Sequence, residues 1–135
     1  FVKNVRLVSI DLKKMDKIEN SFQLVGDFSS KETQERIRSL FRSKVDVVTS
    51  DMAVNTTGIK NIDSIYTGEL CKEAILFAKE IIVDDGKFVS KIFLGTSFNE
   101  IILLAKEIFK EVKVFKPKSS RKESKESFIV CKKLR

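Results

Sequence analysis

Three aspartates stand at the ends of short apolar runs that are typical of buried strands. These are Asp11, Asp27 and Asp51. Because ligands of open parallel sheets bind outside the carboxyl ends of the strands, we expect the three carboxylates to face a common site. There they could accept hydrogen bonds from ribose hydroxyls, an adenine amine and a cationic group. The alternative for each aspartate is a turn former or a helix cap.

A lysine also occupies the middle of an apolar strand. Lys91 lies within the run Lys87–Phe93, with Val89 and Phe93 on its own face of the predicted strand. An ammonium group in a buried strand is costly unless it is paired or lies at a functional edge. One interpretation is a side chain that snorkels from the strand end. The functional interpretation is a charge partner of Asp51, or a proton acceptor, at the carboxyl edge of the sheet.

Composition excludes several other kinds of site. The 135-residue chain contains no histidine. This removes Ser-His and Cys-His nucleophile pairs, HExxH metalloprotease sites and most zinc sites. Its two cysteines, Cys71 and Cys131, form no CxxC motif. We expect them to be buried apolar thiols in a reducing compartment, and we predict no metal site.

The positive charge is concentrated near the end of the chain. The formal net charge is +7, and residues 110–135 alone contain ten basic and three acidic residues. This pattern favours a segment that binds a polyanion, although a solvated, lysine-rich tail is the alternative. No apolar run approaches the ~18 residues of a membrane span. We therefore expect a cytoplasmic protein with no membrane partner.

Strands and helices alternate along the chain. The predicted strands are Val5–Asp11, Ser21–Asp27, Val45–Ser50, Lys87–Phe93, and stretches near 112–115 and 128–132. The predicted helices run from a cap at Ser29 or Ser30 to about Ser43, from about Ile62 to Val83, and near 97–109, with a turn at 84–86. This order, with near-continuous apolar strands, predicts one α/β domain over residues 1–135 with a mostly parallel, doubly wound sheet.

Several motifs together resemble the FtsJ/RrmJ-type ribosomal RNA large-subunit (23S) uridine 2′-O-methyltransferases. The resemblance covers essentially the whole chain. The motifs are Ser9-Ile10-Asp11-Leu12 with Met15-Asp16, Gly26-Asp27-Phe28, Ser50-Asp51-Met52-Ala53 with Asn55 and Gly58, Lys91-Ile92-Phe93, and Lys116-Pro117-Lys118-Ser119-Ser120-Arg121 followed by Glu126.

The resemblance implies a Rossmann-like methyltransferase fold whose last strand is antiparallel, with S-adenosylmethionine (SAM) as cofactor. By resemblance, Asp11 would hold the cofactor ribose and Asp27 would contact the adenine. Asp51 would lie beside the methionine end of SAM and the reacting centre. Lys91 would take the proton of the 2′-hydroxyl, with Glu126 as its orienting partner. The sequence leaves open whether these acids or burial decide the charge state of Lys91.

The implied substrate is ribosomal RNA within a large ribosomal subunit or its precursor, methylated by a monomer. We expect the basic segment to bind this RNA through Lys118, Arg121 and Lys122. Arg121 is the strongest candidate, since a guanidinium can contact a phosphate through two parallel hydrogen bonds.

The chain departs from the family pattern in two ways. Val54 replaces the usual proline, and the sequence begins at what would be the family's second strand. The family's first strand, its Gly-rich SAM loop and an additional N-terminal lysine have no counterpart here. The chain therefore matches the C-terminal portion of such a domain.

Two other function classes remain open. One is a non-catalytic RNA-binding module with a vestigial Rossmann core. The other is an NAD-type nucleotide domain, which shares the acid after the second strand but does not explain Lys91 or Glu126. The sequence upstream of Phe1 would discriminate among the three.

Overall fold

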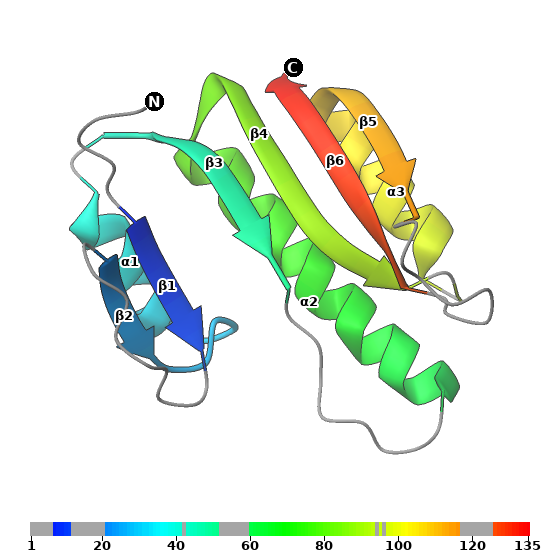
Figure 1. Cartoon of the computed structure of the whole chain (residues 1–135), viewed down its shortest axis with the longest axis horizontal. Helices are drawn as coiled ribbons and strands as arrows, with labels where there is room; N and C mark the ends of the chain where they lie inside the picture. The colour runs from blue at the N-terminus through cyan, green and yellow to red at the C-terminus, as the bar shows by residue number, and fades with distance from the viewer. Residues whose placement is uncertain are drawn as a thin grey trace. The chain divides into compact units, whose positions relative to one another are not determined.

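The computed structural model describes residues 7–11, 21–41, 43–51, 60–93, 95, 97–116 and 126–135. The chain forms two compact units, residues 1–43 and 44–135, and each is described by itself. Figure 1 shows the elements of both units.

The described residues of the first unit form two parallel strands and a helix. Strands β1 (Leu7–Asp11) and β2 (Ser21–Val25) pair residue by residue, with Asp11 opposite Val25. Helix α1 (Lys31–Leu40) begins after Ser30, one of the two predicted caps, whose hydroxyl accepts a hydrogen bond from the Thr33 N–H at 3.3 Å. This bond satisfies one of the donors that the first helical turn leaves unpaired.

Helix α1 ends three residues before the predicted Ser43. Phe41 adopts an extended backbone, and its N–H bonds to the carbonyl of Arg38, which closes the last turn. On this helix Ile37 is buried, whereas Leu40 and Phe41 are half-buried.

The second unit is built on a four-stranded sheet in the order β3-β4-β6-β5. The strands are β3 (Val45–Ser50), β4 (Ile82–Phe93), β5 (Phe109–Phe115) and β6 (Glu126–Leu134). Strand β3 is parallel to β4, and β6 is antiparallel to both β4 and β5. The predicted antiparallel last strand is therefore confirmed.

The two helices of this unit, α2 (Lys60–Ile81) and α3 (Phe98–Ile108), lie on one side of the sheet (Figure 1). The core lies between them and the strands. Its fully buried large residues include Ile75 from α2, Phe88 from β4, Ile101 from α3 and Ile129 from β6. Burying such side chains contributes about 1.5–3 kcal/mol each, so this layer fixes the positions of the strands.

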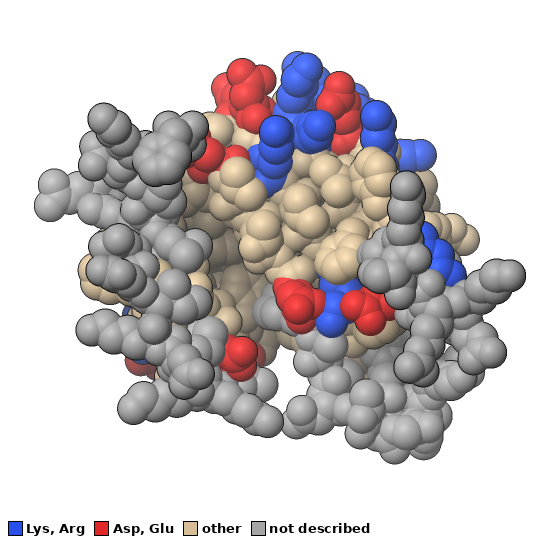
Figure 2. Space-filling view, viewed as in Figure 1, with Lys and Arg blue, Asp and Glu red and all other residues tan. Residues whose placement is uncertain are grey.

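The opposite side of the sheet is called the outer face here. Since side chains alternate along a strand, the register places a defined set of residues on it. The set comprises Val47, Thr49, Lys87, Val89, Lys91, Phe93, Glu111, Lys113, Phe115, Glu126, Phe128, Val130 and Lys132. Figure 2 shows charged side chains gathered toward two ends of this face, with uncharged residues between them.

The predicted boundary between α2 and β4 is wrong. The helix ends at Ile81 instead of Val83, and β4 starts at Ile82 and includes the residues predicted as a turn. Ile82 pairs with Val45, but Val47 already pairs with Lys87, so 83–86 form an irregularity within the strand. Gly86 is required there, because a Cβ would overlap Ile82 Cγ1.

The other boundaries differ by a few residues. Strand β5 begins at Phe109, and β6 extends beyond the predicted stretch in both directions. A membrane-spanning helix, long and apolar enough to cross, does not occur among the described residues.

Candidate active site

Lys91 is held between two carboxylates. Its Nζ lies 2.7 Å from Asp51 Oδ1 and 3.6 Å from Glu126 Oε1. The lysine comes from β4, Asp51 follows β3, and Glu126 opens β6, so the two flanking strands each supply one acid to the central strand. The predicted pairing of Lys91 with Asp51 at the carboxyl edge is confirmed by this geometry.

The register explains why these three residues meet. Ser50 pairs with Ser90, so the next residue of each strand, Asp51 and Lys91, lie side by side. On the other side of β4, Phe93 pairs with Glu126 two residues beyond the lysine. The Lys91 side chain is 17% exposed, whereas those of Asp51 and Glu126 are 78% and 40% exposed. The cluster is therefore open to a ligand on its acidic side.

The acids decide the charge state that the sequence left open. The hydrogen bond to Asp51 raises the pKa of Lys91 above its ordinary value, and Glu126 adds to this effect, whereas burial opposes it. In the resting state Lys91 is therefore an ammonium group. Such a group can orient an oxygen atom of a ligand, and it must first lose its proton before it can act as a base.

Asp11 and Asp27 lie together in the first unit, at the carboxyl ends of β1 and β2. The backbone carbonyl of Asp11 accepts a hydrogen bond from the Gly26 N–H at 2.9 Å, which ties the two strand ends together. Both carboxylates are exposed. Both aspartates therefore stand at the carboxyl ends of neighbouring strands, as the apolar pattern of the sequence predicts.

Asp27 also has a local structural role. Its Oδ1 accepts hydrogen bonds from the Ser29 N–H at 2.9 Å and the Ser29 hydroxyl at 2.6 Å. These bonds, led by the one from the hydroxyl, lower the pKa of Asp27. This arrangement forms the turn that leads into α1, as the turn-former alternative predicts, and it keeps the carboxylate ionised.

The remaining predicted site residues are placed only in part. The carboxylates of Asp11 and Asp27 belong to the unit 1–43, and the Lys91 cluster belongs to the unit 44–135. Lys118, Arg121 and Lys122 lie outside the described residues, as does the stretch 52–59 that follows Asp51.

Aromatic residues around Lys91 were missed by the sequence reasoning. Phe128 on β6 pairs directly with Lys91, and Phe115 on β5 pairs with Phe128. The three side chains therefore form a row across the outer face. The alternation of side chains between the two faces of β5 and β6 could have identified them. That inference needs the correct ends of both strands.

The cysteines match their predicted role. Cys71 and Cys131 are buried and unpaired, and burial raises both thiol pKa values, that of Cys131 to about 12. They are therefore protonated and unreactive at neutral pH. The described part of the chain contains no group of three or more potential metal ligands.

Comparisons with known proteins agree with this geometry. The family model of FtsJ-like methyltransferases matches residues 1–134. "Ribosomal RNA large subunit methyltransferase E" of Pelagibacter ubique is 72% identical over 134 residues, which are 99% of this chain and 66% of that protein. The protein of the same name from Rickettsia akari is 43% identical, over 95% of this chain and 56% of its own length. The chain thus spans less than two thirds of these relatives.

Solved structures share the architecture. A ribosomal RNA methyltransferase from Plasmodium falciparum superimposes with a TM-score of 0.82 at 27% identity, over 95% of this chain and 71% of its own. A methyltransferase from Streptococcus mutans in complex with SAH gives a TM-score of 0.58 at 11% identity, over 96% of this chain and 72% of its own, a likeness of fold alone. With the family model covering nearly every residue, the chain belongs to the FtsJ-like methyltransferase family and has its Rossmann-like α/β fold.

Proposed function

We propose that the complete protein methylates a ribose 2′-hydroxyl in large-subunit ribosomal RNA, with SAM as methyl donor. The observation that carries the proposal is the clamping of Lys91 between Asp51 and Glu126 in an FtsJ-like chain. The names of the relatives support RNA as the substrate, and the resemblance supports a uridine as the target. We further propose one methyltransferase domain acting as a cytoplasmic monomer on a large ribosomal subunit or its precursor.

The carboxylates of the chain are suited to the cofactor as hydrogen-bond acceptors. Exposed carboxylates such as those of Asp11 and Asp27 suit ribose hydroxyls and an adenine amine, respectively. The exposed carboxylate of Asp51 suits the cationic methionine end. SAM, when bound, supplies an activated methyl group on a sulfonium with a good leaving group. The protein therefore has to align the ribose oxygen and assist the loss of its proton.

In this proposal Lys91 first orients the 2′-oxygen and then accepts its proton. Orientation suits the ammonium form, which donates hydrogen bonds. Acceptance requires the neutral amine, which the raised pKa makes rare in the resting state. A cation that binds beside Asp51 weakens the hold of that carboxylate on Lys91. Its binding would lower the pKa of the lysine and increase the neutral fraction.

The pH dependence of the reaction tests the role of Lys91. We expect kcat to rise about tenfold per pH unit from about pH 6 to about pH 9, since deprotonation of Lys91 limits the rate over this range. Glu126→Gln removes a charge that favours the ammonium form, so it should shift the profile to lower pH. Glu100→Gln, in an exposed pair with Lys72, is the control. A flat profile, or one that Glu126→Gln does not move, would rule out proton acceptance by Lys91.

Cofactor binding tests the role of Asp11. Asp11→Ala removes a charged acceptor for ribose hydroxyls, an interaction worth about 1.5–3 kcal/mol. We expect the affinity of the complete protein for SAM to fall at least about tenfold, measured by isothermal titration calorimetry. Asp46→Ala, at an exposed position of β3, should leave it unchanged. Equal affinities for Asp11→Ala and the wild type would mean that Asp11 only shapes the turn after β1.

The enzyme and the non-catalytic RNA-binding module differ in one observable. Incubating the complete protein with SAM and large ribosomal subunits that lack the modification should produce a 2′-O-methylated nucleotide, detected by mass spectrometry of nuclease digests. RNA binding with no methylated nucleotide would favour the binding module instead.

A further inference from the structure

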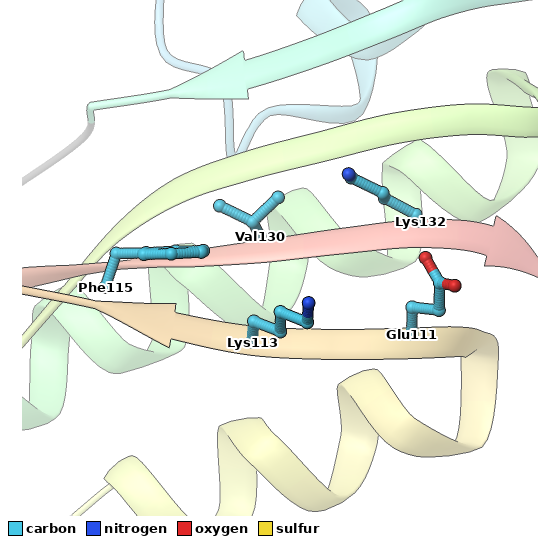
Figure 3. Close-up of a pocket in the computed structure, with 5 residues that line it drawn as sticks. All are labelled: Glu111, Lys113, Phe115, Val130 and Lys132. Carbon is cyan, nitrogen blue, oxygen red and sulfur yellow. The ribbon is translucent and has the colours of Figure 1, made fainter.

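Away from the Lys91 cluster, the outer face carries an open groove over the last two strands. Its lining consists of Glu111, Lys113 and Phe115 from β5 and Val130 and Lys132 from β6. Figure 3 shows these side chains projecting from adjacent strands on one side of the sheet, with Phe115 at one end and Glu111 and Lys132 at the other. The groove therefore combines an aromatic end, an apolar floor at Val130 and a charged end.

The aromatic end adjoins the candidate active site. Phe115 is 52% exposed and is the cross-strand neighbour of Phe128, which in turn neighbours Lys91. With strands about 4.8 Å apart, Phe115 lies about 10 Å from Lys91 across the sheet. A nucleic-acid strand covers that distance in a few stacked nucleotides at about 3.4 Å each.

The charged end suits a phosphate. Lys113 and Lys132 are diagonal neighbours on the same face, where side chains lie about 7–8 Å apart. Lys132 also stands directly opposite Lys87 of β4, a like-charge pair that destabilises a sheet and that an anion would relieve. On the other side of β6, Glu111 of β5 lies directly opposite Lys132. Its Oε1 also lies 4.0 Å from Lys133 Nζ, so its negative charge is divided between two lysines.

We propose that this groove is a nucleotide subsite for the RNA strand near the target ribose. The base stacks on Phe115 over Val130, and the phosphates contact Lys113 and Lys132. Exposed aromatic rings beside basic side chains are the usual means of holding single-stranded RNA with little sequence preference. The inference deepens the proposed function and rests on it, since it assumes that the ligand at Lys91 is RNA.

Equilibrium binding to a short single-stranded RNA containing 2-aminopurine, whose fluorescence falls when the base stacks, tests the subsite in the complete protein. We expect Phe115→Ala to weaken binding at least about fivefold and to abolish the fluorescence change, while Phe115→Trp retains both. Val114→Ala is the matched control, because Val114 is 40% exposed on the same strand but faces the other side of the sheet.

The lysines are tested by salt. Lys113→Ala and Lys132→Ala should each make the dependence of log affinity on log salt concentration less steep by about 0.7. Lys79→Ala, at an exposed position of α2 outside the basic segment, should leave that slope unchanged.

The outcomes separate the subsite from the reaction. If the wild type methylates RNA but Phe115→Ala and both lysine variants bind like the wild type, the subsite is wrong and the proposed function stands. If Phe115→Ala weakens stacking while the wild type transfers no methyl group, the groove is supported and the reaction is wrong. No binding of RNA by the wild type would overturn both.

Discussion

Replacing Lys91 with alanine in the complete protein is expected to abolish methyl transfer while SAM binding stays close to the wild-type level. The variant removes the group that orients the 2′-hydroxyl and accepts its proton, a contribution of about 100-fold to 10,000-fold in rate. It leaves the carboxylates of Asp11, Asp27 and Asp51 in place for the cofactor. The measurement is single-turnover transfer of labelled methyl groups, with SAM affinity determined in parallel.

The controls separate chemistry from folding. Lys91→Met keeps the length of the side chain without its charge and should be as inactive as Lys91→Ala. Lys79→Ala removes an exposed lysine of α2 and should have wild-type activity. Glu126→Ala should change the rate much less than Lys91→Ala does, since Glu126 lies 3.6 Å from the lysine and acts through it. Near-normal single-turnover transfer by Lys91→Ala would contradict the assignment.

Much of the fold could be predicted, because the pattern of apolar residues along the chain matches the alternating strands and helices that bury them. Strand β3 has the predicted bounds, and residue type limited the helix cap to Ser29 or Ser30, of which the structure shows Ser30. The boundary between α2 and β4 could not be found this way. Asp84-Asp85-Gly86 has the composition of a turn, but pairing of Ile82 with Val45 extends the strand across it.

The candidate site was predictable to a different degree for each member. A lysine inside an apolar strand and an acid after the neighbouring strand were enough to place Lys91 beside Asp51. Glu126 came from the family resemblance, since the apolar pattern of the last strand begins two residues later. The pKa of Lys91 is raised because its 2.7 Å contact with Asp51 outweighs the effect of burial. Residue types alone cannot show which of these two effects is larger.

The basic segment should supply most of the affinity for RNA. The middle of this segment, residues 116–125, lies between two described strands. Strand β5 ends at Phe115, and β6 begins at Glu126, whose Oε1 lies 3.6 Å from Lys91 Nζ. Strand β5 therefore ends, and β6 begins, at the edge of the sheet where the ribose would bind, and five of the ten residues 116–125 between them are basic. Phosphates flanking the target would lie within reach of this segment.

Simultaneous replacement of Lys118, Arg121 and Lys122 by alanine tests this surface. Each lost phosphate contact reduces the number of counterions released, by about 0.7 for a single strand. We expect the slope of log affinity against log salt to become less steep by about 2, with at least a tenfold loss of affinity at low salt. Arg121→Ala alone should account for the largest single share, since a lysine cannot replace two parallel hydrogen bonds to a phosphate.

The matched control is a triple alanine variant at Arg36, Lys79 and Lys106, which removes the same charge from exposed helical positions. If net charge alone attracted RNA, both triple variants would lose affinity and slope equally. If the lysines of the segment only solubilise the surface, neither variant would differ from the wild type. A loss confined to the Lys118/Arg121/Lys122 variant requires the phosphates to contact this segment, which would place the RNA strand beside Lys91.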